Sequence, residues 1–317
     1  MKFMGWIGVM LALLGCGNPV DTTHLEKDLL HLETKIPLTG VSGRIDHLAY
    51  DSVGRRVFVA ALGNGTVEVV DLSSGRRLYS ITGLREPQGV VYVSSRLVVA
   101  DGGSGDCIVY DGGRYLELGR VALGDDADNV RYDGARVYVG YGSGGIAVID
   151  PLAIRKVGDL PLKGHPESFQ LDDSGRVWIN IPDEGEVVTA DMRTLRITGQ
   201  WKNRGGAANF PMALDKARLF VGYRHPAQVR VLDNRTGSMG ASLPCVGDAD
   251  DVFYDNGVLF VSGGEGYLDV FRGDTLVNHI PTRRGARTCL WLPGERKLIL
   301  AVPARGGEEA ALWVYGM

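Results

Sequence analysis

Short runs of hydrophobic and β-branched residues, separated by turns, dominate this chain. Residues 43–83 contain four such runs, at 48–51, 56–61, 66–71 and 77–81. They are bounded by clusters of Gly, Asn, Asp and Ser at 52–54, 63–65 and 73–75. This pattern predicts four antiparallel strands joined by tight turns. A single sheet of this kind cannot bury both of its faces, so the pattern also predicts neighbours of the same kind.

The same unit recurs along the chain at a spacing of roughly 40 residues, which is typical of propeller blades. Its clearest marker is the turn that leads into the first strand. Seven copies of that turn are present: GRIDHLAYD (43–51), EPQGVVYV (86–93), DADNVRYD (126–133), HPESFQLD (165–172), ANFPMALD (208–215), ADDVFYD (249–255) and ARTCLWL (286–292). The sequence therefore predicts seven blades.

The seventh copy ends at Met317, directly after its third strand. The stretch 32–40 near the other end of the chain is similar in pattern to the fourth strands of the other copies. A closed ring leaves no unpaired sheet edges. We therefore predict an all-β fold over residues 31–317: a seven-bladed β-propeller of four-stranded antiparallel blades, with the last blade completed by the N-terminal strand.

The chain before residue 31 has a different character. Residues 1–15 place an apolar run after Lys2, which indicates a secretory signal, because a membrane span needs about 20 residues. Residues 13–16, Leu-Leu-Gly-Cys, resemble the bacterial lipobox, and this resemblance implies a lipid on Cys16. The alternative is an ordinary signal with a chance cysteine. Residues 16–30 are expected to be a tether, and Gly17 favours the periplasmic side of the outer membrane.

The repeats resemble the YncE-like proteins, which are seven-bladed YVTN-type β-propellers of the bacterial envelope. The residues that carry the resemblance include FVAALGNGTVEVVDL (58–72), GDDADNVRYD (124–133), GHPESFQLD (164–172) and SGGEGYLDVF (262–271). The resemblance covers nearly all of the chain after the tether. It implies the fold and an envelope location, and it implies no settled activity. Such proteins are also distantly similar to gluconolactonases.

The turns before the first strands aim their residues at the mouth of the central channel. One position carries a carboxylate in four different blades. The equivalent residues at this position are Asp46, Gln88, Asp128, Glu167, Phe210, Asp250 and Thr288, and those at the next position are His47, Gly89, Asn129, Ser168, Pro211, Asp251 and Cys289.

Carboxylates gathered around one axis repel one another unless a positive charge lies between them. A divalent cation such as Ca²⁺, bound by Asp46, Asp128, Glu167 and Asp250, is one solution, with Asn129 and His47 as further candidates. The gluconolactonase resemblance implies a comparable set of ligands and a metal-bound water that attacks a lactone. The alternative is turn chemistry, because Asp and Asn hydrogen-bond the backbone of tight turns and a repeat copies them.

The same face is expected to carry cations from blades five and seven. Arg224, His225, Arg287 and Arg305 lie in its loops, together with Gln88 in a channel turn. These residues are candidates for binding an anionic group, and the alternative is a set of unrelated surface charges.

The chain contains no HExxH, CxxC, GxSxG or phosphate-binding loop, and we identify no catalytic residue. The leading hypothesis is a monomeric binding scaffold for a small molecule, peptide or envelope protein, attached to the membrane only by its lipid. A metal-dependent lactonase is the alternative. The formal net charge of −4 disfavours a nucleic-acid partner.

Overall fold

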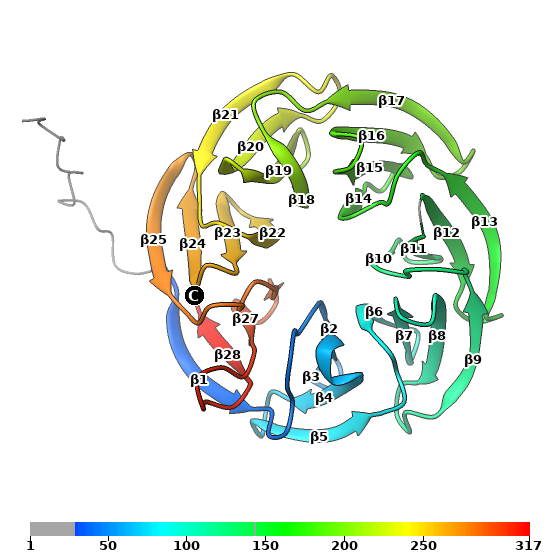
Figure 1. Ribbon diagram of the computed structural model, residues 1–317, viewed down its shortest axis with the longest axis vertical. Helices are drawn as coiled ribbons and strands as arrows, with labels where there is room; N and C mark the ends of the chain where they lie inside the picture. The colour runs from blue at the N-terminus through cyan, green and yellow to red at the C-terminus, as the bar shows by residue number, and fades with distance from the viewer. Residues whose placement is uncertain (1–28, 143) are drawn as a thin grey trace, which may run out of the picture.

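Seven four-stranded antiparallel sheets form a closed ring in the computed structural model, which describes residues 29–142 and 144–317 (Figure 1). The predicted seven-bladed propeller is therefore confirmed. The predicted signal segment, the lipidation residue Cys16 and nearly all of the predicted tether lie outside the described residues. No helix among the described residues is long and apolar enough to cross a membrane.

Each blade contributes one strand to the wall of the central channel and presents its fourth strand to the outside of the ring (Figure 1). The first strands are β2 (Leu48–Asp51), β6 (Pro87–Val93), β10 (Val130–Tyr132), β14 (Phe169–Leu171), β18 (Ala207–Leu214), β22 (Ala249–Asp255) and β26 (Cys289–Leu292). The second strands are β3 (Arg56–Ala61), β7 (Arg96–Asp101), β11 (Val137–Tyr141), β15 (Arg176–Ile181), β19 (Arg218–His225), β23 (Val258–Gly263) and β27 (Lys297–Val302).

The outer half of each blade is equally regular. The third strands are β4 (Thr66–Asp71), β8 (Asp106–Asp111), β12 (Gly145–Asp150), β16 (Glu186–Asp191), β20 (Ala227–Asp233), β24 (Tyr267–Arg272) and β28 (Ala311–Gly316). The fourth strands are β5 (Arg76–Ile81), β9 (Glu117–Ala122), β13 (Arg155–Pro161), β17 (Arg196–Lys202), β21 (Met239–Pro244), β25 (Thr275–Pro281) and β1 (His31–Pro37). A short 3₁₀ turn, η1 (Leu62–Asn64), links β3 to β4.

Aspartates explain why the third strand of several blades turns so regularly into the fourth. Asp71 Oδ1 accepts a hydrogen bond from the backbone N–H of Ser73 at 2.7 Å, and Asp191 Oδ1 accepts one from that of Arg193 at 2.8 Å. Asp111, Asp150 and Asp233 do the same in blades two, three and five. These local bonds satisfy backbone donors that the turn removes from the sheet. They also show that much of the repeated acidity of this sequence is turn chemistry.

The N-terminal strand closes the ring as predicted. β1 pairs with β28, so that strands from the two ends of the chain complete blade seven. Ile36 and Leu38 are fully buried in a cluster that includes Ile299 and Leu312. Burial of each of these two side chains contributes about 1.5–3 kcal/mol to stability.

The packed domain begins slightly earlier than predicted. Leu30, which the sequence assigned to the tether, is 2% exposed and packs in a cluster with Phe260 and Tyr315. The backbone N–H of Leu29 donates to Asn278 Oδ1 at 2.9 Å. These contacts fix the start of the described chain against blades six and seven.

The ring has two faces, which differ in the loops that they carry. The turns between fourth and first strands and between second and third strands lie on one face, which we term the acidic face. The turns between first and second strands and between third and fourth strands lie on the opposite face, the cavity face. Because β1 is a fourth strand, the described chain enters the ring at the cavity face.

Candidate functional site

Three polar side chains meet across the channel one residue beyond the acidic positions of the repeat. His47 Nδ1 lies 3.5 Å from Asp251 Oδ1, and Asn129 Nδ2 lies 3.3 Å from His47 Nε2. These residues come from blades one, six and three, and we term them the His47 layer. The layer separates an ion-pair network on the acidic face from a cavity that opens on the other face.

Backbone hydrogen bonds hold these turns in the channel. The N–H of Asp46 donates to the carbonyl of Ala60, and the N–H of Ala60 donates to the carbonyl of His47, at 2.7 and 3.0 Å. Blade three repeats the pair, with Asp128 and Asn129 bonded to Gly140 at 2.9 Å each. Each turn therefore presents one side chain to the acidic face and the next to the His47 layer.

The channel is narrow at this level. A Cβ atom added to Gly89 would lie 2.2 Å from the carbonyl oxygen of Asp128, so only glycine fits between blades two and three.

The four predicted carboxylates do gather on the acidic face, but arginines of the protein lie between them. Arg44 Nη2 lies 2.9 Å from Asp46 Oδ2 and 3.6 Å from Asp250 Oδ2. Arg224 Nη2 lies 2.5 Å from Asp250 Oδ1. Guanidinium groups thus offset part of the charge on the buried carboxylates of Asp46 and Asp250.

The other two carboxylates are held less tightly. Asp128 Oδ2 lies 3.6 Å from His165 Nε2. Glu167 makes no ion pair within 4 Å among the described residues. Burial raises the pKa of Glu167 to about 7, and the neighbouring Asp128 carboxylate adds to the shift.

Charges in this network change one another's protonation. Burial raises the pKa of Asp46 to about 7, although His47 and Arg44 oppose the shift. Burial disfavours the charged form of His47, but the carboxylates of Asp251 and Asp46 outweigh it and raise its pKa to about 10. For His165, burial is likewise outweighed by Asp128, and the pKa is raised to about 9. Both imidazoles are therefore protonated on both ring nitrogens, and positively charged, at neutral pH.

A protonated His47 defines how Asn129 is oriented. Both ring nitrogens of an imidazolium donate, so Nε2 needs an acceptor. The Oδ1 atom of Asn129 is buried and otherwise has no hydrogen-bond partner. Turning the amide by 180° about its last side-chain bond places Oδ1 against Nε2, where it can accept the imidazolium proton.

The arrangement does not fit a divalent cation. The guanidinium of Arg44 occupies the position between Asp46 and Asp250 that a shared cation would need. Among residues 29–142 and 144–317, no group of three or more His, Cys, Asp or Glu side chains is placed to hold a metal ion. We therefore derive no chemical step through a metal.

The predicted anion-binding residues of this face are mostly engaged elsewhere. Arg287 Nη2 pairs with Asp248 at 2.8 Å, and Arg224 pairs with Asp250. Gln88 donates to Asp126 at 2.9 Å. The two remaining candidates, His225 and Arg305, lie exposed at the rim. The structure does bring Arg224 and Arg287 together, but both face the carboxylates of Asp248 and Asp250.

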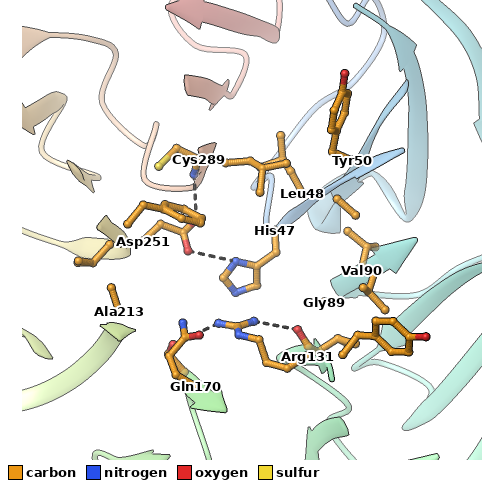
Figure 2. A pocket seen from close by; sticks show the side chains of 18 of the residues that line it. His47, Leu48, Tyr50, Gly89, Val90, Arg131, Gln170, Ala213, Asp251 and Cys289 are labelled. Carbon is orange, nitrogen blue, oxygen red and sulfur yellow. Dashed lines mark hydrogen bonds and ion pairs between the residues drawn. The ribbon is translucent and has the colours of Figure 1, made fainter. Parts of the chain in front are cut away.

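A cavity of about 540 Å³ lies on the other side of the His47 layer. Its walls are the first strands, and its floor is polar (Figure 2). The floor residues are His47, Arg131, Ser168, Gln170 and Asp251. None of the four predicted carboxylates lines it. A cavity of this size matches the pockets that take small organic ligands.

Sequence reasoning found only part of this floor. His47 was among the candidates, whereas Arg131, Gln170 and Asp251 were not. A signal was nevertheless present. The residues equivalent to Arg131 in the other six blades are Ala49, Val91, Gln170, Ala213, Phe253 and Trp291, and none of them is charged. An arginine that departs from the repeat is not required by the blade itself, and this departure could have identified the site.

The fold and the channel together define a seven-bladed propeller with a small-molecule-sized cavity on its axis. The chain is similar in structure to a chain from the Kuenenia stuttgartiensis hydrazine synthase, with a TM-score of 0.74 and 17% sequence identity. The similarity covers 89% of this chain and 96% of that one. At this identity the likeness shows the fold alone. No protein-family model matches the chain, and no curated protein matches it by sequence.

Proposed function

We propose that this protein is a binding module whose central channel takes a small organic molecule from the cavity face. The observation that carries the proposal is the cavity of about 540 Å³, with an apolar wall and a polar floor (Figure 2). Rigid concave sites with a few convergent polar groups are the usual form of small-molecule sites.

The state of His47 argues against a role for this residue as a general base. A general base must be able to take up a proton near the working pH. The carboxylates beside His47 raise its pKa to about 10, so it already holds its proton at neutral pH. The alternative drawn from the sequence, a metal-dependent lactonase, gains no supporting contact among the described residues.

We further propose that the protein is a YncE-like envelope lipoprotein, tethered through Cys16. The support is the apolar run and the Leu-Leu-Gly-Cys stretch at 13–16. Growth of an expressing bacterium with radiolabelled palmitate tests this proposal. We expect label in the wild-type protein and none in the Cys16→Ser variant; label in both, or in neither, would contradict it.

Ligand-detected NMR with a mixed library of neutral, anionic and cationic fragments tests the binding proposal. We expect at least one fragment to bind saturably with one site per chain. Gln170 lines the cavity, and the equivalent residue in blade six is Phe253, a large ring that also lines it. Gln170→Trp should therefore fold, fill the floor and abolish binding.

Gln200→Trp is the matched control, because Gln200 is exposed on β17, away from the channel. It should leave binding unchanged. A library without any hit, or binding that survives Gln170→Trp, would overturn the proposal.

A further inference from the structure

The charged residues of the cavity floor are two cations, His47 and Arg131, and one carboxylate, Asp251. His47 is a cation, and Asp251 is its partner at 3.5 Å. The second oxygen of Asp251 accepts a hydrogen bond from the backbone N–H of Cys289 at 2.8 Å. Arg131 is the second cation of the floor. Asp251 and Asp128 act on its charge from a distance, but neither carboxylate is close enough to form an ion pair with it.

Arg131 has no carboxylate partner within 4 Å among the described residues, although it lies deep in the channel. Its guanidinium donates to the carbonyl of Val130 at 2.8 Å and to Ser168 Oγ at 3.4 Å. These two bonds use two of the five N–H donors of an arginine. Burial lowers the pKa of Arg131, but a guanidinium stays charged at any physiological pH.

An unpaired guanidinium in a cavity is a receptor for an anion. Carboxylates match its planar set of donors, and such charged bonds are stronger than neutral ones. Figure 2 shows the Arg131 guanidinium and the His47 ring extending toward each other over the cavity floor, from blades three and one. An anion seated there would face both cations.

The upper wall of the cavity is apolar in character. Its tyrosines are Tyr50, Tyr92, Tyr132 and Tyr254. Each hydroxyl is already bonded to a group outside the cavity: in order, Glu295, Arg56, the Gly134 carbonyl and Arg218. The rings therefore offer carbon surface to a ligand, and Met212 and Leu214 extend that surface.

We infer that the ligand of the channel cavity is a small organic carboxylate with an apolar or aromatic body, whose carboxylate is bound by Arg131 beside His47. This inference rests on the proposed binding function and adds the class of ligand. A single cation without an ion-pair partner suits a monoanion better than a polyanion, and the tyrosine rings suit an apolar or aromatic body.

Titration with three probes tests the inference. 2-Naphthoate carries the expected carboxylate and ring, 2-naphthamide is its neutral isostere, and inorganic phosphate is an anion without an apolar body. We expect naphthoate to bind the wild-type protein at least about tenfold more tightly than either of the other two, because a hydrogen bond to a charged group is worth that factor or more. Equal affinity for naphthoate and naphthamide would overturn the inference without requiring any variant.

Substitution of the arginine sharpens the test. Arg131→Gln should weaken the binding of naphthoate at least about tenfold and leave the affinity for naphthamide unchanged. Arg131→Lys should have an intermediate effect on naphthoate binding. Arg193→Gln is the matched control, because Arg193 is exposed and pairs with Asp191 at an outer turn. Naphthoate affinity that is unaffected by Arg131→Gln would overturn the inference.

The two proposals fail in different ways. If neutral or cationic fragments bind in the fragment screen and Gln170→Trp removes them, the channel is a binding site but its ligand is not a carboxylate. If no probe and no fragment binds, the binding function itself fails.

Discussion

The two ends of the channel use charge in opposite ways. On the acidic face, Asp46 and Asp250 share Arg44, and Arg224 pairs with Asp250, so that the charges satisfy one another. On the cavity side, Arg131 has no carboxylate of its own. The carboxylates of the acidic face follow the repeat, whereas Arg131 departs from it. In this propeller the repeated charges serve the structure, and the exceptional charge marks the candidate binding site.

Opening the ring should have the largest effect on stability, because it disrupts the acidic face and the cavity together. Deletion of residues 32–40 removes most of β1, exposes the edge of β28 and loses the burial of Ile36 and Leu38. We expect thermal unfolding, followed by circular dichroism, to become broad and shift to much lower temperature relative to a chain that begins at Leu29. If the chain without residues 32–40 melts as sharply and at the same temperature as the chain that begins at Leu29, then closure of the ring by β1 does not support the two ends of the channel.

Arg224→Ala tests whether the acidic face is structural. The substitution leaves Asp250, whose side chain is 8% exposed, without its 2.5 Å partner. We expect a loss of about 3 kcal/mol in the free energy of unfolding, toward the low end for a broken buried ion pair because Asp250 can take up a proton. Urea unfolding measures it.

The control for this prediction is Arg193→Ala, which removes an exposed ion pair with Asp191 and should cost no more than about 1 kcal/mol. Equal losses in the two variants would mean that the acidic face does not stabilise the ring.

The acidic face should also make stability depend on pH. Burial raises the pKa of Asp46 and of Glu167 to about 7. Between about pH 4 and pH 7 the unfolded chain has released these protons and the folded chain still holds them, so stability falls as pH rises through this window. Glu167→Gln should flatten that part of the profile, as measured by urea unfolding at a series of pH values.

The exposed Glu184 supplies the control, and Glu184→Gln should leave the profile unchanged. At higher pH the protonated His47 and His165 extend the decline, because their pKa values are raised to about 10 and about 9. If stability rises between pH 4 and pH 7, and rises equally in Glu167→Gln, the raised pKa values of Asp46 and Glu167 are contradicted.

The smallest effect on stability is expected for Arg131→Gln. Arg131 makes two hydrogen bonds and no ion pair among the described residues, so its removal leaves no buried carboxylate unpaired. We expect the free energy of unfolding to change by no more than about 1 kcal/mol. A loss as large as that of Arg224→Ala would show that Arg131 is a structural cation, and the contrast between the two ends would disappear.

The fold was predictable because repetition carries it. Seven copies of one turn, such as those at 43–51 and 126–133, gave the number of blades, and the missing fourth strand of the last copy predicted the closure by β1. The strand bounds of blade one agree with the sequence pattern to within a residue.

The site was predictable only in part, because alignment of repeats places residues but does not pair them. Asp46, Asp128, Glu167 and Asp250 do share a level of the channel, yet the position of the Arg44 side chain between two of them depends on tertiary packing. Arg44 lies two residues before the aligned position, so the alignment of the carboxylates does not point to it as their counter-charge.

The chain enters the ring on the same side as the mouth of the cavity, because β1 is a fourth strand. If Cys16 carries the proposed lipid, the 14 residues from there to Leu30 reach at most about 50 Å when fully extended. A tether of this length would keep the propeller near the bilayer, attached on the face where the cavity opens. A ligand released from the membrane would then have only a short distance to diffuse to the channel.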